Sequence, residues 1–138
     1  MRSNATRLVA PVLACLGTLS VVGSALAADY SVDFGIDTVS AGKDAGTVAC
    51  QERQICRAKI ESLGLSISFF WKESGEVVVE LEKDDRTCCY FSGGGRSAIV
   101  KAHTKLARLP FFKGSAPRGG LFIQNEHAGI LYLRFDRQ

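Results

Sequence analysis

The sequence has few of the residue patterns that mark an enzyme. It contains only two histidines, and it lacks a Gly-x-Ser-x-Gly nucleophile motif, a Gly-Lys-Ser/Thr phosphate loop and a Cys-x-x-Cys redox motif. Hydrolytic, nucleotide-dependent and thioredoxin-like chemistry therefore have little support. Internal repeats and low-complexity tracts are missing as well. We expect a protein that is not an enzyme and needs no cofactor.

A long apolar run that could cross a membrane is also missing. The longest run, from Leu8 to Gly23, is interrupted by Pro11 and is followed by small residues. Two arginines precede it, and Ala25-Leu26-Ala27 has the small-x-small pattern of a signal-peptidase site. Residues 1–27 therefore predict an export signal and no transmembrane span, and the mature protein is expected in a bacterial periplasm or secreted.

Removal of the 27-residue signal would leave 111 of the 138 residues. A chain of this length builds one hydrophobic core, so residues 28–138 are expected to form a single exported domain. The 17 Lys and Arg include Arg2 and Arg7 of the signal, which leaves 15 basic residues against 14 Asp and Glu. The net charge therefore indicates no particular partner, and nucleic acid is not expected outside the cytoplasm.

Alternation of apolar and polar residues predicts most of the secondary structure. Apolar residues at 30, 32, 34 and 36 alternate with small or acidic ones, which is typical of a half-buried strand. Further strands are expected at 65–71, 77–81, 87–91, 121–124 and 130–135. Small and polar residues predict loops at 40–46 and 111–120 and a turn at 125–129.

One covering helix is expected over about 97–108. Ser97 can cap its N-terminus, apolar residues follow at helical spacing, and Pro110 would end it. Because most connections are short, the strands should pair as antiparallel hairpins. The predicted fold class is a β-rich α+β domain, in which an antiparallel sheet of five to six strands is covered by one helix and stabilised by disulfides.

The segment 50–63 fits two structures. Its charged residues favour a second helix, with Gly64 as the terminator. Cys56, Ala58 and Ile60 also alternate with charged residues, and the phase then changes near Ser62, as a turn or bulge would produce. We favour the strand.

Four cysteines remain after the signal, Cys50, Cys56, Cys88 and Cys89, and an even count in a small exported domain usually indicates disulfides. We favour two bonds that join Cys50 and Cys56 to Cys88 and Cys89. A bond between the adjacent Cys88 and Cys89 is less favourable, because neighbouring Cα atoms lie about 3.8 Å apart, below the roughly 4.4 Å that disulfides prefer. The alternative pairs Cys50 with Cys56 and Cys88 with Cys89, which makes the second pair a candidate thiol switch. A metal site that adds His103 and His127 lacks the usual ligand spacing, so no metal is expected.

A triple glycine precedes the predicted helix. Gly93, Gly94 and Gly95 match the letters of Gly-x-Gly-x-x-Ala, but no acidic residue follows about twenty positions later. Glycines at the start of a helix allow backbone N–H groups to approach an anion. We therefore include Gly93–Gly95 in a candidate anion-binding nest.

Acidic residues are absent between 86 and 125, whereas six of them fall between 73 and 85. The first of these two segments contains seven basic residues: Arg86, Arg96, Lys101, Lys105, Arg108, Lys113 and Arg118. Lys101, Lys105 and Arg108 would share one face of the predicted helix. The acidic segment could pack beside the basic one and neutralise it. Otherwise the basic residues form a positive surface.

These patterns predict an exported, non-enzymatic binding or inhibitor-like module. It would contact an anionic envelope component or an acidic protein through the basic segment 86–118. One alternative is a thiol redox or metal-handling protein centred on Cys88 and Cys89. Another is a structural envelope protein that dimerises along an exposed edge strand. The sequence does not indicate the oligomeric state.

Overall fold

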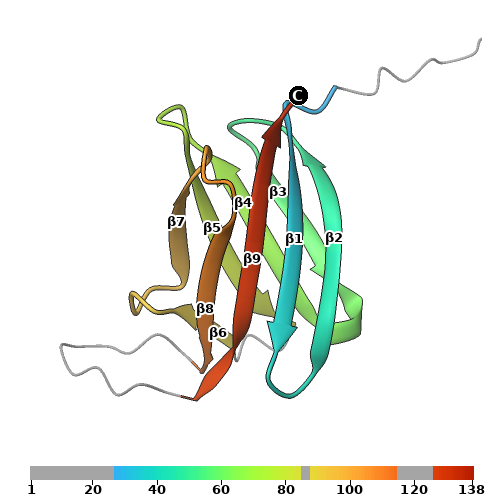
Figure 1. Cartoon of the computed structure of the whole chain (residues 1–138), viewed down its shortest axis with the longest axis vertical. Helices are drawn as coiled ribbons and strands as arrows, with labels where there is room; N and C mark the ends of the chain where they lie inside the picture. Colours follow the sequence, from blue (N-terminus) through green and yellow to red (C-terminus); the bar gives the residue numbers. More distant parts are fainter. Residues whose placement is uncertain (1–26, 85–87, 115–125) are drawn as a thin grey trace, which may run out of the picture.

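The described residues of the computed structural model, 27–84, 88–114 and 126–138, form two antiparallel sheets that pack face to face (Figure 1). The strands are β1 (Tyr30–Thr38), β2 (Gly42–Cys50), β3 (Ile55–Ile60), β4 (Leu65–Trp71), β5 (Glu76–Lys83), β6 (Cys88–Phe91), β7 (Ser97–Lys101), β8 (Ala107–Lys113) and β9 (His127–Arg137). A 3-10 turn, η1 (Glu61–Leu63), joins β3 to β4. Residues 1–26 of the predicted export signal lie outside the described residues.

One sheet has five strands in the order β2-β1-β9-β8-β6, and the other has four in the order β3-β4-β5-β7. The C-terminal strand β9 lies between β1 and β8, so the two ends of the domain pair with each other. In Figure 1 the five-stranded sheet lies in front, and the outer face of the four-stranded sheet is turned away from the viewer. Ile55 of β3 and Ile99 of β7, two of the most exposed large apolar residues, lie on this outer face.

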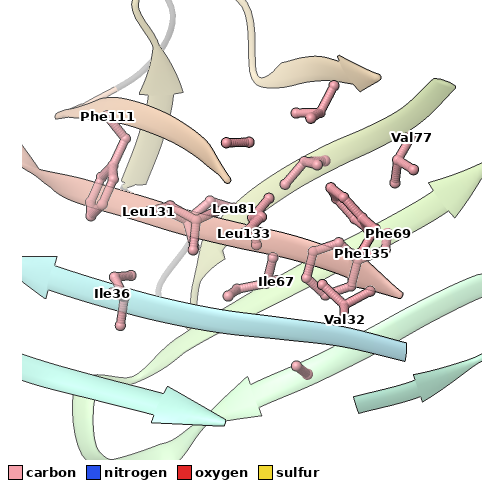
Figure 2. Packing of buried hydrophobic residues seen from close by; sticks show 14 of the residues in the cluster. Val32, Ile36, Ile67, Phe69, Val77, Leu81, Phe111, Leu131, Leu133 and Phe135 are labelled. Atoms are coloured by element: carbon pink, nitrogen blue, oxygen red, sulfur yellow. The ribbon is translucent and has the colours of Figure 1, made fainter. Parts of the chain in front are cut away.

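The core lies between the sheets. Side chains from both sheets point into this space, as Figure 2 shows for Ile67 and Phe69 of β4 and Leu131 and Leu133 of β9. Along β4 every second residue is buried, in agreement with the period-two pattern of the sequence. Burial of one large apolar side chain contributes roughly 1.5–3 kcal/mol, so this inward-facing set supplies most of the favourable free energy of folding.

The predicted covering helix is wrong, and with it the α+β class. Residues 97–101 form β7 and residues 107–113 form β8, so the described fold is almost entirely sheet. Val100 points inward and Ile99 outward, the alternation of a strand. Pro110 lies inside β8, which the sequence-based prediction did not allow. It is tolerated because the pairing with β6 ends at Phe111, so the missing N–H of Pro110 faces no partner strand on that side.

The segment 50–63 contains the expected strand. β3 covers Ile55–Ile60, and η1 changes the phase at Ser62 before Gly64, which has a positive φ of 61°. The strands predicted at 65–71 and 77–81 are also present as a hairpin. The strand predicted at 121–124 lies outside the described residues.

Three predicted loops and turns are shorter than expected. β2 begins at Gly42 inside the predicted loop 40–46, β8 extends to Lys113, and β9 begins at His127. The small residues of β2 have a packing role. A Cβ at Gly46 would lie 2.8 Å from Cζ of Phe34, so the glycine makes room for this ring on the neighbouring strand. Small residues that looked like a loop therefore belong to a strand.

Candidate partner-binding surfaces

Three of the predicted basic residues lie around the connection between β7 and β8. Lys101 ends β7, Lys105 lies in the connection, and Arg108 is the second residue of β8. The backbone here is held by a hydrogen bond from the N–H of Thr104 to the carbonyl of Lys101 (3.0 Å). We call Lys101, Lys105 and Arg108 the basic corner. They do not share a helix face, because no helix is present at these residues.

The basic corner is fixed to the neighbouring β4–β5 turn and is not neutralised by it. The N–H of Ala102 donates to the carbonyl of Gly75 (2.9 Å). Within the described residues, none of the three cations has a carboxylate within 4.0 Å, although Glu76 lies opposite Lys101 in the sheet register. Leu106 is 60% exposed beside them. Lys101 lies on the outer face of the four-stranded sheet and Arg108 on the outer face of the five-stranded sheet, so the cations surround the corner and do not share one sheet face.

The other predicted basic residues are placed differently. Arg96 lies just before the start of β7, whereas Lys101 lies at its other end. The guanidinium nitrogen of Arg96 is 3.9 Å from a carboxylate oxygen of Glu82. Lys113 ends β8 and forms a 2.9 Å ion pair with Glu126. Arg86 and Arg118 lie outside the described residues. The expected single positive surface is therefore reduced to the basic corner, and part of the basic segment is paired with acidic residues.

The triple glycine forms a turn between β6 and β7 and does not start a helix. The N–H of Gly94 donates to the carbonyl of Phe91 (2.8 Å), and the N–H of Phe91 donates to the carbonyl of Gly95 (2.9 Å). The Gly94 N–H is thus used inside the turn. Without a helix start, Gly93–Gly95 lose the dipole that supported an anion-binding nest.

The cysteines pair within each group, so the pairing that we favoured is wrong. Cys50 and Cys56 form a disulfide with their Cα atoms 5.5 Å apart, and Cys88 is bonded to Cys89. The first bond is possible because Cys50 ends β2 and Cys56 lies near the start of β3, which brings the edges of the two sheets together. It therefore links the two layers of the sandwich.

Cys88 lines a small cavity at the end of the sandwich. The cavity has a volume of about 180 Å³, and Lys83, Lys113 and Phe111 also line it. Cys89 points into the core and is 3% exposed. Of the two residues, Cys88 is the more accessible to a reagent that enters this cavity.

The histidines do not join the cysteines in a metal site. His103 lies in the β7–β8 connection, at the end of β8 opposite the Cys88–Lys113 pair. The ring of His127 contacts the edge of Phe112, with centroids 5.7 Å apart. Within residues 27–84, 88–114 and 126–138, no group of three or more His, Cys, Asp or Glu is arranged to hold a metal ion.

An open hollow on the outer face of the five-stranded sheet was not predicted. Gly35 and Ala45 form its floor, and Tyr132 and Lys43 border it. Hydrogen bonds from Thr47 and Arg134 hold the pKa of nearby Asp33 below its usual value. Because Arg134 and Asp33, and likewise Lys43 and Asp37, are paired with each other, these charges stabilise the surface and are not free for a ligand.

An apolar groove on the outer face of the four-stranded sheet was also missed. It has a volume of about 340 Å³ and is lined by Ile55, Phe70 and Val78, with Arg57 and Glu80 beside them. Ile55 and Ile99 are 65% and 61% exposed. The available signal was that these residues occupy the outward positions of their strands, where polar residues are usual.

No protein-family model, curated protein or solved structure matches this chain. Among the residues that the structure describes, none belongs to a helix with the length and apolar character needed to span a membrane. The proposed function therefore depends on the surfaces themselves.

Proposed function

We propose that this protein is an exported, non-enzymatic binding module, and that its basic corner holds an anionic envelope component or an acidic protein. The observation that carries the proposal is that Lys101, Lys105 and Arg108 fall within eight residues around one connection, and that none of them has a carboxylate within ion-pair distance among the described residues. Connections at the end of a rigid sandwich are common binding sites, because the sheets hold them in place. Exposed Leu106 adds apolar contact.

The test uses two matched triple variants of the exported, oxidised protein. One replaces Lys101, Lys105 and Arg108 by Gln, and the control replaces Lys43, Arg53 and Lys59 by Gln, which removes the same charge elsewhere. Binding to vesicles of phosphatidylglycerol and phosphatidylcholine is measured by cosedimentation, with heparin retention as a second anionic probe. Each cation near an anionic surface contributes about 1 kcal/mol, so the first variant should bind roughly 100-fold more weakly.

The control should bind nearly as well as the original protein, and salt should weaken both. Equal losses in the two variants would show that only net charge matters and would refute the basic corner as the site. Absence of salt-sensitive binding to either probe, together with failure to bind an acidic polypeptide such as polyglutamate, would refute the anionic partner.

A second candidate function is thiol chemistry at Cys88. The observation in its favour is that Cys88 lines a cavity together with Lys83 and Lys113. Ammonium groups near a cysteine stabilise its thiolate, which is the reactive form. Brief treatment with a mild thiol reductant followed by alkylation and mass analysis tests it. Selective labelling at Cys88 would support the thiol function, whereas resistance of all four cysteines until denaturation would refute it.

A further inference from the structure

The outer face of the four-stranded sheet carries a row of apolar side chains that crosses all four strands. Ile55 of β3 lies opposite Phe70 of β4, Phe70 opposite Val78 of β5, and Val78 opposite Ile99 of β7. All four occupy outward positions, and nothing among the described residues covers Ile55 or Ile99. Such a row on a solvent-facing sheet is typical of an interaction surface.

Charged residues flank this row on both sides. On one side the next outward row contains Arg57 on β3, Ser68 on β4 and Glu80 on β5, and the row after it contains Lys59, Ser66 and Glu82. On the other side Lys72 lies opposite Glu76, joined by a 2.8 Å backbone hydrogen bond. Lys101 of β7 lies opposite Glu76 in the same row. Cations therefore lie on β3 and at the ends of β4 and β7, and carboxylates lie on β5.

We propose that this face binds the same face of a second copy of the chain across a two-fold axis parallel to the strands. Such an axis places β3 of one copy over β7 of the other and β4 over β5. Each row of one copy then lies over the same row of the other copy. Ile55 then faces the second copy's Ile99, and Phe70 faces its Val78. The apolar row is complementary to itself.

The same operation brings opposite charges together in the flanking rows. Glu80 of the second copy lies above Ser68, next to Arg57, and Glu82 of the second copy lies next to Lys59. On the other side Lys72 faces the second copy's Glu76. Lys101 of β7 lies next to the second copy's Lys72, so this row contains one like-charge neighbour beside the opposite-charge pair. Arg57, Lys59 and Glu80 have no ion-pair partner within the described part of their own chain, so they are available for these contacts.

A two-fold axis perpendicular to the strands gives a poorer match. It would reverse the order of the rows and place Glu80 of one copy over Glu76 of the other. Like charges at close distance disfavour this arrangement. The charge pattern therefore selects a second copy and also its orientation.

The size of the face sets the strength of association. Four strands spaced about 4.8 Å apart and four rows spaced about 6.6 Å apart cover roughly 500 Å² on each copy. The total of roughly 1,000 Å² lies below the about 1,200 Å² of standard stable interfaces. We therefore expect a reversible dimer with a dissociation constant in the micromolar range. The basic corner shares only Lys101 with this face, and the variants that test the dimer leave Lys101 unchanged.

Sedimentation velocity of the exported, oxidised protein from about 5 to about 500 μM tests the proposal. The protein should pass from monomer to dimer, and replacement of Ile55 and Ile99 by Ser should raise the dissociation constant at least about tenfold. The matched control replaces Val39 by Ser, because Val39 is as exposed as Ile55, at 65%, and follows β1 of the other sheet. The control should dimerise normally. A monomer throughout the range, or equal effects of both variants, would overturn the proposal.

Charge reversal tests the orientation. Arg57→Glu alone places the new carboxylate next to Glu80 of the second copy, and Glu80→Arg alone places two guanidinium groups together, so each variant should remain monomeric. A mixture of the two variants brings both pairs of opposite charges together and should form a heterodimer. Dimerisation of either variant alone, or absence of a heterodimer in the mixture, would exclude the proposed axis.

Discussion

Replacement of Tyr30 by Phe should stabilise the protein. Tyr30 is the first residue of β1, is 0% exposed, and packs on Trp71 with ring centroids 4.6 Å apart. Its hydroxyl is buried without a hydrogen-bond partner among the described residues. Burial of a hydroxyl without a partner costs roughly 1–3 kcal/mol in proteins, and the phenylalanine ring keeps the packing. We expect a gain of about 1 kcal/mol in the free energy of unfolding, or about 3–5 °C in Tm.

The difference should increase in alkaline solution. Burial, followed by the negative charges of Glu52 and Asp29, raises the pKa of Tyr30 from 10.0 to about 12. Below pH 10 the hydroxyl is protonated in both states, so it adds no pH dependence. Between pH 10 and 12 the unfolded chain loses this proton and the native chain keeps it, so stability falls. The fall corresponds to roughly 2–3 kcal/mol, and Tyr30→Phe does not show it.

Urea denaturation followed by fluorescence of Trp71, the single tryptophan, measures both effects. Tyr132→Phe is the control, because this tyrosine lies partly exposed on the outer face of the five-stranded sheet. Subtraction of the two profiles removes the contribution of other groups that titrate in alkali. A loss of more than about 1 kcal/mol in Tyr30→Phe would show that the hydroxyl has a partner and refute the reasoning.

Two further changes test the packing of the sandwich. Gly129→Ala should lower stability by roughly 2–4 kcal/mol in thermal denaturation, because its Cβ would meet the backbone oxygen of Asp37 and lie 2.6 Å from Cζ of Phe111. Gly93→Ala, whose Cβ meets no described atom within 4 Å, should be nearly neutral, and equal effects would contradict this account. Replacement of both Cys50 and Cys56 by Ser should cost about 2 kcal/mol in urea denaturation, because the bond closes a short loop across a sequence separation of 6. An unchanged midpoint would show that this bond does not restrict the unfolded chain.

The sequence predicted the strands whose apolar residues alternate without interruption. β4 and β5 were placed correctly because one of their faces is wholly buried, so every inward residue is apolar. β2 was missed because it is an edge strand made of small and polar residues. Its membership in the sheet is decided by pairing with β1, which is a long-range property that local composition does not contain.

The helix prediction failed at a segment where two periodicities overlap. Ala98, Ala102 and Leu106 follow a helical repeat, yet the described chain turns at Ala102 and changes sheets before Ala107. Pairing of Ile99 and Val100 with β5 stabilises a strand where the local pattern had favoured a helix. The three basic residues still flank one short connection, but Lys101 and Arg108 belong to the outer faces of different sheets and not to one helix face. The apolar groove could not be found in the same way, because its residues come from separate strands.

The charge pattern of the protein depends on register more than on composition. In the sequence, acidic residues between 73 and 85 precede a basic segment, which suggests a positive surface for a foreign anion. In the sheet, β5 lies between β4 and β7, so its carboxylates form a column, and Lys72 and Lys101 lie on either side of it at Glu76. The cations Arg57 and Lys59 of β3 come from outside both segments and complete the pattern. A column of one sign that lies off the centre of a sheet face meets the opposite sign when the face is turned about the strand direction. In the proposed dimer, the segregation of charge along the chain would therefore let one copy recognise another.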